Sequence, residues 1–368
     1  MRIFELCTSH GHGGLELYAL QISRWLKQQG HHCSVVVAPA TMMSERTSKL
    51  ALETIFCKPM FRILPLLAAH RLAKIIDQEN VDILHAHWTK DLPLAVLAKK
   101  LSSRKPKLVF IRHMAITRHK RDFYHRFIYH SIDRYLVITQ QLFNEAKRFL
   151  PVSEDKLQLI YHGVADFEAS DPLACKQFLS ANEIQDNVFR ILLPGRIEHY
   201  KGQHTLVEAL GLLSQQGINV EVVLLGHIMD EAYFKQLRED AKKAGLENKV
   251  HYLGFIENPT LFYNCFDVVV LTTYAETFGL VLVEAMKSGV AAIGTNAGGV
   301  PEIIEHNKTG MLYQPGDAND LARCLKKMIK DPEWTKKLAD AGKKYADDTF
   351  SEQQHYTKLN NIFTELTH

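Results

Sequence analysis

Two glutamates eight positions apart, Glu276 and Glu284, have the chemistry to bind sugar hydroxyls, because a carboxylate accepts hydrogen bonds from vicinal hydroxyl groups. Arg196 and Lys201 lie in a short segment, residues 195–202, and could neutralise a diphosphate, the arginine as a planar fork and the lysine as a point charge. Either pair alone is a weak signal, since charged residues at these spacings are common on solvated surfaces. The elements expected around them decide the interpretation.

The two glutamates fall where a strand is expected to lead into a helix. The apolar run 267–273 predicts a buried parallel strand, and from residue 278 the apolar positions follow a period of 3.6. A helix N-terminus offers free N–H groups and the positive end of its dipole, which suits a phosphate. We therefore expect Glu284 to bind a ribose one turn into the helix, and the helix start to bind the phosphates through Thr277, Phe278, Gly279 and Leu280.

The remaining pattern predicts an α/β protein with two similar halves. A strand at 2–7, a Gly-rich loop ending in Gly13 and Gly14, a helix and a strand at 34–38 form a βαβ unit with a parallel sheet. The second half starts again with a strand at 189–193. Further strands are expected at 83–85, 108–111, 135–138, 159–162, 220–225, 251–254, 268–271 and 291–294. The sequence thus predicts domains over 1–165 and 166–350, joined near 163–188, and a helical tail over 351–368.

The segment from 254 to 310 resembles the C-terminal domain of the retaining glycosyltransferases of family 4 (group 1), which have the GT-B fold. The residues that carry this resemblance are Leu253-Gly254-Phe255, Glu276-Thr-Phe-Gly-Leu280, Val283-Glu-Ala-Met286, Ser288-Gly289, Gly298-Gly-Val-Pro-Glu302 and Thr309-Gly310. The resemblance implies two Rossmann-like domains, each a doubly wound parallel sheet, that face a cleft. It also implies that the tail helix crosses back onto the N-terminal domain.

The resemblance also implies roles for single residues. Residues 195–202 look like the family's Gly-Arg-x4-Lys-Gly motif, so Arg196 and Lys201 are expected to contact the donor diphosphate. Gly13 and Gly14 resemble a Gly-Gly-x-Glu loop that reaches toward the donor phosphates, and Glu276 is expected to orient the donor sugar. The base pocket is expected to be lined by Gly254, Phe255 and Ile256.

Histidines supply the other candidate site residues. His113 follows the strand at 108–111 and matches the position of a histidine that family members place beside the reacting sugar. We therefore expect the catalytic set to be His113, Glu276, Arg196 and Lys201. Of the pair His85 and His87, we interpret His85 as structural and His87 as an acceptor-side residue; two histidines without a third ligand do not make a metal site.

The expected activity is the retaining transfer of a hexosyl group from a UDP- or GDP-linked sugar to a glycan or glycolipid, such as lipopolysaccharide or another cell-envelope glycan. The chain has no Asp-x-Asp motif and no Cys/His cluster, so we expect a metal-independent enzyme without a cofactor. Its six cysteines lie far apart in sequence and fit a reducing cytoplasm. Two alternatives are a sugar-nucleotide epimerase of the same fold and a non-catalytic protein that binds nucleotide sugars.

The charge is unevenly distributed along the chain. Residues 1–165 hold 24 Lys and Arg against 13 Asp and Glu, a balance of +11, whereas the remainder has a balance of −8. Eleven of these cations fall between Lys99 and Arg134, where apolar residues such as Phe123 and Phe127 recur at helical spacing. This stretch is either a solvated face over a core-facing stripe, or an interfacial helix that meets anionic lipid at the inner face of the membrane. No nucleic-acid-binding module accompanies it.

Overall fold

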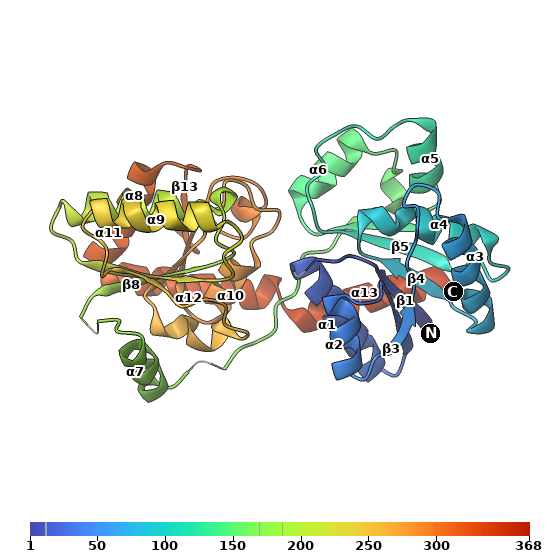
Figure 1. Ribbon diagram of the computed structural model, residues 1–368, viewed down its shortest axis with the longest axis horizontal. Coiled ribbons are helices and arrows are strands. Elements are labelled where there is room, and N and C mark those ends of the chain that lie inside the picture. The colour runs from blue at the N-terminus through green and yellow to red at the C-terminus, as the bar shows by residue number, and fades with distance from the viewer. Residues whose placement is uncertain (12, 169, 186) are drawn as a thin grey trace. The chain divides into compact units, whose positions relative to one another are not determined.

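The computed structural model describes residues 1–11, 13–168, 170–185 and 187–368. By backbone contacts the chain forms two compact units, residues 1–161 with 353–368, and residues 162–352. Each unit is a parallel sheet flanked by helices (Figure 1). The expected pair of doubly wound parallel-sheet domains is confirmed.

The first unit has a seven-stranded sheet in the order β3-β2-β1-β4-β5-β6-β7. Its strands are β1 (Arg2–Cys7), β2 (His32–Val37), β3 (Glu53–Phe56), β4 (Ile83–Ala86), β5 (Lys107–Arg112), β6 (Arg134–Val137) and β7 (Leu157–Leu159). Its helices are α1 (Gly14–Gln28), α2 (Met42–Lys49), α3 (Leu66–Gln78), α4 (Leu92–Leu101), α5 (Phe123–His130), α6 (Gln140–Phe149) and α13 (Glu352–Thr367), with the short 3₁₀ turns η1 (Thr89–Asp91) and η2 (Glu154–Lys156).

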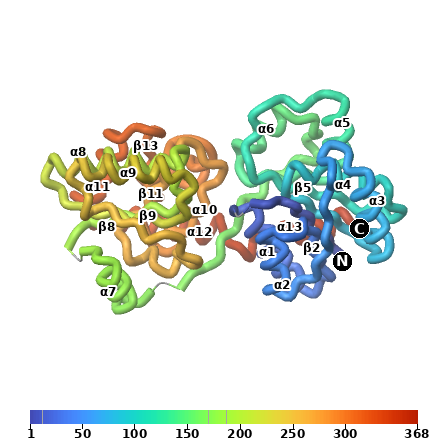
Figure 2. The backbone as a smooth tube through the Cα atoms, in the orientation of Figure 1, coloured from blue at the N-terminus to red at the C-terminus, as the bar shows by residue number. Residues whose placement is uncertain are grey.

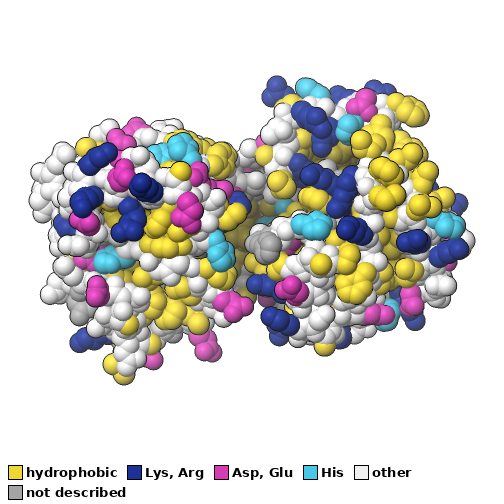
Figure 3. Space-filling model, viewed as in Figure 1, with side chains coloured by type: hydrophobic (Ala, Val, Ile, Leu, Met, Phe, Trp, Pro, Cys, Tyr) yellow, Lys and Arg dark blue, Asp and Glu magenta, His cyan; other side chains and the backbone are white. Residues whose placement is uncertain are grey.

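The last helix, α13, packs within the first unit. His355 Nε2 lies 2.8 Å from the Tyr18 hydroxyl, and the rings of Phe363 and His85 are 5.2 Å apart. Both chain ends therefore lie in this unit, and the red end of the trace runs among blue elements (Figure 2). Many Lys and Arg side chains cover the visible face of the same unit (Figure 3).

The second unit has a six-stranded sheet in the order β10-β9-β8-β11-β12-β13. Its strands are β8 (Phe189–Pro194), β9 (Val220–Leu225), β10 (Val250–Tyr252), β11 (Val268–Val270), β12 (Ala291–Thr295) and β13 (Met311–Tyr313). Its helices are α7 (Pro172–Ala181), α8 (Gln203–Ser214), α9 (Glu231–Lys243), α10 (Leu280–Lys287), α11 (Ala318–Lys330) and α12 (Pro332–Thr349), with the 3₁₀ turns η3 (His199–Lys201), η4 (Pro259–Cys265) and η5 (Val300–Glu302).

Both faces of the second sheet are buried, which explains why its strands read as continuous apolar runs. In β8, Ile191 and Leu193 pack into a core with residues of α8, α9 and α11. Leu192, which points to the opposite face, packs with residues of α7, η4 and α10. The alternation of side chains along a strand thus fixes β8 between two helical layers.

One covalent link differs from the sequence-based expectation of unlinked cysteines in a reducing compartment. Cys175 of α7 and Cys265 of η4 form a disulfide, with their Cα atoms 5.1 Å apart. The two residues are 90 positions apart in sequence, so no local spacing marks them as a pair. They meet because α7 and η4 pack on the same face of the sheet, where the rings of Phe178 and Phe262 also stack at 4.1 Å.

A close backbone approach at Gly298 ties the loop after β12 to the loop that carries Glu276. Gly298 has φ +66°, and a Cβ atom there would lie 2.1 Å from the carbonyl oxygen of Glu276. The next residue, Gly299, donates its N–H to that same oxygen at 2.8 Å. Only glycine fits this position without moving Glu276.

Gly298→Ala should therefore lower the thermal midpoint of unfolding, because the backbone clash adds to a strain of about 1–3 kcal/mol for a non-glycine residue in this conformation. Gly217→Ala is the matched control, since Gly217 has a similar φ of +73° and open space around it. Equal losses for the two variants, measured by calorimetry, would show that the contact with Glu276 is unimportant.

Candidate active site

The candidate site residues of the second unit gather at the carboxyl edge of its sheet. The chain crosses from one side of the sheet to the other between β8 and β11, which are neighbours although β9 and β10 intervene in sequence. In a parallel sheet such a crossing separates the loops of the two central strands and leaves room for a ligand. Arg196 and Lys201 follow β8, and Glu276 follows β11.

Lys201 and Glu276 are in direct contact. Lys201 Nζ lies 2.9 Å from Glu276 Oε2, and both side chains are partly exposed. The Thr272 hydroxyl donates to the Lys201 carbonyl oxygen at 2.6 Å, which fixes the backbone of the lysine against the loop after β11. A cation and a carboxylate are therefore held side by side at the sheet edge, where one could bind phosphate and the other hydroxyl groups.

Arg196 lies on the same loop but has a different partner. Its Nη2 atom lies 2.9 Å from Glu198 Oε1, and more than half of its side chain is exposed. A solvent-exposed pair of this kind is weak, so the guanidinium can exchange Glu198 for another anion at little energetic cost. The partner Glu198 was not anticipated from the sequence.

The loop from Glu276 leads into α10 as the sequence predicts. Gly279, with φ +102°, precedes the helix and has no side chain to cap it, and the Thr277 N–H donates to Glu276 Oε1 at 3.3 Å. Leu280 is the first helical residue, and Phe278 is buried. The start of α10 thus presents backbone N–H groups beside the Lys201–Glu276 pair, which is the arrangement expected for an anion site.

Glu284 lies one turn into α10 and accepts a hydrogen bond of 3.0 Å from the Tyr263 hydroxyl. Burial raises the pKa of the Glu284 carboxyl, and the bond from Tyr263 opposes this effect only in part. Among the described residues Tyr263 is the hydrogen-bond partner of this carboxyl, and a partly satisfied carboxylate gains from further donors, such as a pair of ribose hydroxyls.

The loop after β10 supplies an aromatic surface. Gly254 has φ +72°, and the Phe255 ring stacks on His227 at a centroid distance of 4.4 Å. Ile256 packs against the core on the α10 side of the sheet. His227 follows β9 and was missed by sequence reasoning, although its position directly after a buried strand, beside Gly226, was a usable signal.

In the first unit, the predicted residues gather where β1 and β4 are neighbours. The Gly13 N–H donates to Glu16 Oε2 at 2.9 Å and the Ser9 hydroxyl to Glu16 Oε1 at 2.5 Å, so Glu16 fixes the loop that ends in Gly13 and Gly14. The Tyr18 ring lies 5.0 Å from that of His113 and 5.7 Å from that of His87. The structure therefore brings the Gly-rich loop and both histidines together around Tyr18.

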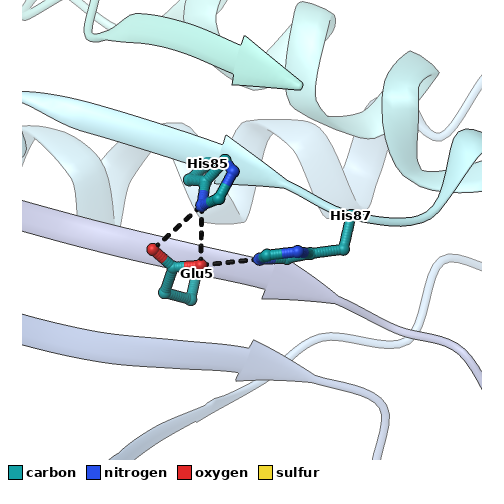
Figure 4. Close-up of side chains that lie close together, drawn as sticks. All are labelled: Glu5, His85 and His87. Atoms are coloured by element: carbon teal, nitrogen blue, oxygen red, sulfur yellow. Dashed lines mark hydrogen bonds and ion pairs between the residues drawn. The ribbon is translucent and has the colours of Figure 1, made fainter. Parts of the chain in front are cut away.

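His85 and His87 both pair with a residue that the sequence reading left out, Glu5 of β1 (Figure 4). His85 Nδ1 lies 2.9 Å and His87 Nε2 lies 2.6 Å from Glu5 Oε2, and all three side chains are buried. The sequence could have pointed to Glu5, because a charged residue inside an otherwise apolar strand needs a buried partner. The role predicted for His87 toward an acceptor stays a prediction, since its imidazole is enclosed in this network.

The ligand-type atoms of Glu5, His85 and His87 lie within 4.8 Å of one another, a spacing that a metal ion could bridge. However, the ring nitrogens His85 Nε2 and His87 Nδ1 have no hydrogen-bond partner within the described ranges. An imidazole that ligates a metal is nearly always held through that second nitrogen. The cluster is thus better explained as a buried network in which both histidines bond to the Glu5 carboxylate.

The network sets the ionisation of its members. Burial by itself would raise the pKa of Glu5, but the charge of His85 and the bonds from both histidines outweigh it and lower that pKa to about 2. Burial and the charge of His85 lower the pKa of His87 to about 4. Burial likewise lowers the pKa of His355 to about 4, although its bond to the Tyr161 carbonyl acts in the opposite direction.

Comparison with known proteins identifies the class. The family described as Glycosyl transferases group 1 matches residues 176–345, and Glycosyltransferase Family 4 matches residues 12–166. Together the two matches account for most of both units, and the chain belongs to the family 4 glycosyltransferases of group 1. The protein is therefore a glycosyltransferase with the GT-B fold.

Several curated proteins and solved structures are similar over long stretches. N-acetyl-alpha-D-glucosaminyl L-malate synthase of Bacillus anthracis is 25% identical, with 81% of this chain and 78% of that protein covered. Putative glycosyltransferase EpsD of Bacillus subtilis is 24% identical, with 94% and 92% covered. A glycosyltransferase from Rickettsia africae superposes with a TM-score of 0.90 at 22% identity, covering 99% of this chain and 98% of that one. Anabaena Alr3699/HepE in complex with UDP and glucose superposes with a TM-score of 0.86 at 21% identity, covering 99% of each chain.

Acid should destabilise the first unit in two steps. His87 and His355 stay neutral in the folded state down to about pH 4 but take up protons near pH 6.5 when unfolded, so stability is full above pH 6.5 and falls from there to about pH 4. The Glu5 carboxylate is protonated near pH 4.5 in the unfolded chain but only near pH 2 in the folded protein, so stability falls further as the pH drops from about 4.5 to about 2. Urea unfolding at a series of pH values measures how the free energy of unfolding changes with pH. Each group contributes at most about 1.4 kcal/mol per pH unit to this slope.

His355→Gln should flatten the dependence of the unfolding free energy on pH between pH 6.5 and 4 by the contribution of about one proton. A slope that does not respond to His355→Gln would show that His355 is already protonated in the folded protein.

Proposed function

We propose that the protein transfers a hexosyl group from a UDP- or GDP-linked sugar to a glycan or glycolipid acceptor, with retention of the anomeric configuration and without a metal ion. The observation that carries the proposal is the Lys201–Glu276 pair at 2.9 Å beside the start of α10, whose N-cap residue is Gly279. The pair offers a cation for the leaving diphosphate and a carboxylate for the sugar hydroxyls, next to backbone donors.

In this proposal, the negative charge that develops on the leaving diphosphate is stabilised by Arg196, Lys201 and the N–H groups of residues 277–280. Fixed cations and dipoles of this kind act in place of the metal ion that other transferases use. Glu284 binds the ribose, and residues 254–256 with His227 lie under the base. The roles of Gly13, Gly14 and His113 toward the donor remain those implied by the family resemblance.

A cell-envelope acceptor is the second part of the proposal. Among the similar proteins are a lipopolysaccharide core biosynthesis mannosyltransferase of Rhizobium leguminosarum, 22% identical over 77% of this chain, and a capsular polysaccharide biosynthesis glycosyltransferase of Staphylococcus aureus. The name of another relative, N-acetyl-alpha-D-glucosaminyl L-malate synthase, points to the small molecule L-malate and not to a glycan, so the acceptor needs a direct test. Within the described residues, no helix combines the length and apolar content needed to cross a bilayer.

The donor can be found with a thermal-shift screen against nucleotide sugars, since a ligand at a hundredfold its Kd stabilises the folded protein by about 2.7 kcal/mol. Incubation with the identified donor and candidate acceptors then tests transfer. Formation of an isomer of the donor in the absence of acceptor would favour the epimerase alternative instead.

Glu284→Ala should weaken nucleotide binding by about 1.5–3 kcal/mol, the value of hydrogen bonds to a charged group. Calorimetric titration with UDP and GDP measures the change without an acceptor. The exposed Glu333→Ala serves as the control for removal of a negative charge from the same unit. Unchanged affinity for the Glu284 variant would place the ribose elsewhere.

Arg196→Ala and Lys201→Ala should each reduce kcat/KM by about 100-fold or more, because both cations face charge that grows in the transition state. Lys235→Ala, which removes an exposed cation from α9, should have little effect. Activity should persist in EDTA; an activity that chelation abolishes and Mn²⁺ or Mg²⁺ restores would contradict the metal-free mechanism.

The basic stretch from Lys99 to Arg134 is proposed to bring the enzyme to an anionic membrane. Reversal of three exposed residues, Arg118, Arg121 and Arg126, to Glu should abolish sedimentation with phosphatidylglycerol vesicles at low salt. The sedimentation of the wild type should decline as salt rises, because the Debye length shortens. Reversal of Lys235, Lys330 and Lys337 in the second unit makes the same change in net charge and should have no effect; if both triple variants lose binding equally, net charge and not this stretch is responsible.

A further inference from the structure

The first unit exposes an unusual run of large apolar side chains between β3 and α3. Within residues 56–67, seven such side chains are more than half exposed: Phe56, Met60, Phe61, Ile63, Leu64, Leu66 and Leu67. The same twelve residues contain no acidic side chain. Soluble proteins rarely expose contiguous apolar surface of this kind unless it binds something.

This segment is anchored, so its exposure is built into the fold. Arg62 Nη1 contacts the Thr8 hydroxyl at 2.6 Å and the buried Asp91 carboxylate at 3.0 Å, and its guanidinium lies 4.7 Å from the Trp88 ring centre. The Tyr124 hydroxyl donates to the Ile63 carbonyl oxygen at 2.8 Å. With Arg62 held inward, its neighbours Phe61 and Ile63 point outward, 66% and 72% exposed.

Helix α5 extends the apolar surface. Tyr124, at its start, makes the contact with Ile63, and the preceding residue, Phe123, is 88% exposed. Phe127, one turn on, is also exposed, and Lys100 Nζ lies 5.1 Å from its ring centre. Of the two readings of this stretch, the core-facing one describes Ile128 and Ile132, which are buried, whereas Phe123 and Phe127 are exposed as the interfacial reading expects.

Cations without acidic partners flank the first turn of α5 in the sequence, and one of them, Lys100, lies beside the Phe127 ring. Among the described residues, Lys100, Arg118, Arg121 and Arg126 are exposed and form no salt bridge with an Asp or Glu side chain. The nearby Asp122 accepts hydrogen bonds from the N–H and ring of His125 at 3.0 and 2.5 Å. Figure 3 shows hydrophobic side chains gathered over α3, α4 and α5 with Lys and Arg beside them.

We propose that residues 56–67 and the first turn of α5, termed here the docking surface, insert apolar side chains into the interfacial layer of an anionic bilayer. Apolar side chains within a cationic rim suit a membrane interface, where the rings and aliphatic groups enter the acyl boundary and the cations contact lipid phosphates. A symmetric pairing of two copies through this surface would oppose like charges. The proposal rests on the proposed function in that it supplies the membrane contact that a lipid-linked acceptor requires.

Insertion can be separated from simple electrostatic attraction. The triple variant Phe61→Ser, Ile63→Ser, Leu67→Ser should lower the partition coefficient on vesicles of equal phosphatidylcholine and phosphatidylglycerol by about 100-fold or more, since each side chain loses its apolar transfer energy. The matched control changes three exposed apolar residues of the second unit, Leu173, Met229 and Leu261, to Ser and should bind as the wild type does. Equal partitioning of both variants would overturn the proposal.

A local probe gives the second readout. Ile63→Trp should show blue-shifted emission and quenching by brominated lipid beyond the wild-type background, whereas Leu173→Trp should show neither. Vesicle binding without quenching at position 63 would overturn insertion and leave electrostatic attachment. A dimer in light scattering that the Phe61, Ile63 and Leu67 variant dissociates would overturn the membrane as the occupant.

UDP and GDP binding by the triple variant should equal that of the wild type. If the wild type and the triple variant both bind nucleotide but neither binds vesicles, the membrane proposals are wrong and the proposed function is unaffected. If the wild type binds vesicles but no nucleotide, the proposed function is wrong and the docking surface is retained.

Discussion

All strands of each sheet run parallel, and this constraint sends every strand's carboxyl end to the same edge. In both units the chain then returns to the sheet next to its first strand, so that β1 lies beside β4 and β8 beside β11. The loops after these two pairs diverge over opposite faces and leave a space that side chains can line. Lys201 and Glu276 meet for this reason, although 75 positions separate them in sequence.

The two sheet edges carry different electrostatics. At the second, the charged groups are partly exposed, and Arg196 has only a solvent-exposed partner, so little free energy is needed to exchange protein partners for a ligand. At the first, Glu5, His85 and His87 are buried and bind one another. Removal of any one of them leaves an uncompensated polar group in the core. We interpret the network of Glu5, His85 and His87 as a structural support for the strand ends. The charged groups beside Lys201 and Glu276 form a site whose ion pairs can be exchanged for contacts with a ligand.

The sequence predicted those parts of the site that lie close together along the chain. The strand, loop and helix around Glu276 follow from apolar periodicity, and α10 begins at Leu280, two residues after the point where the helical period starts. The Gly-rich loop after β1 and the strands that precede His87 and His113 were predicted in the same way.

Other features depend on long-range packing that periodicity does not record. His355 reaches Tyr18 across 337 positions, and Cys175 reaches Cys265 across 90. The exposure of Phe123 and Ile63 accompanies long-range contacts, since Arg62 is held by Thr8 and Asp91 and the Tyr124 hydroxyl donates to the Ile63 carbonyl oxygen. The strand β3 also escaped prediction, because its four residues are only partly buried and mix polar and apolar types.

The central claim is that the edge between β8 and β11 holds the diphosphate of a nucleotide. A crystal structure with UDP, and another with GDP, would test it most directly. We expect the phosphate oxygens at the start of α10, about 3 Å from Lys201 Nζ and the Arg196 guanidinium, with the ribose hydroxyls at Glu284. A bound nucleotide whose phosphates contact neither cation, while Lys201 keeps Glu276 as its partner, would contradict the account.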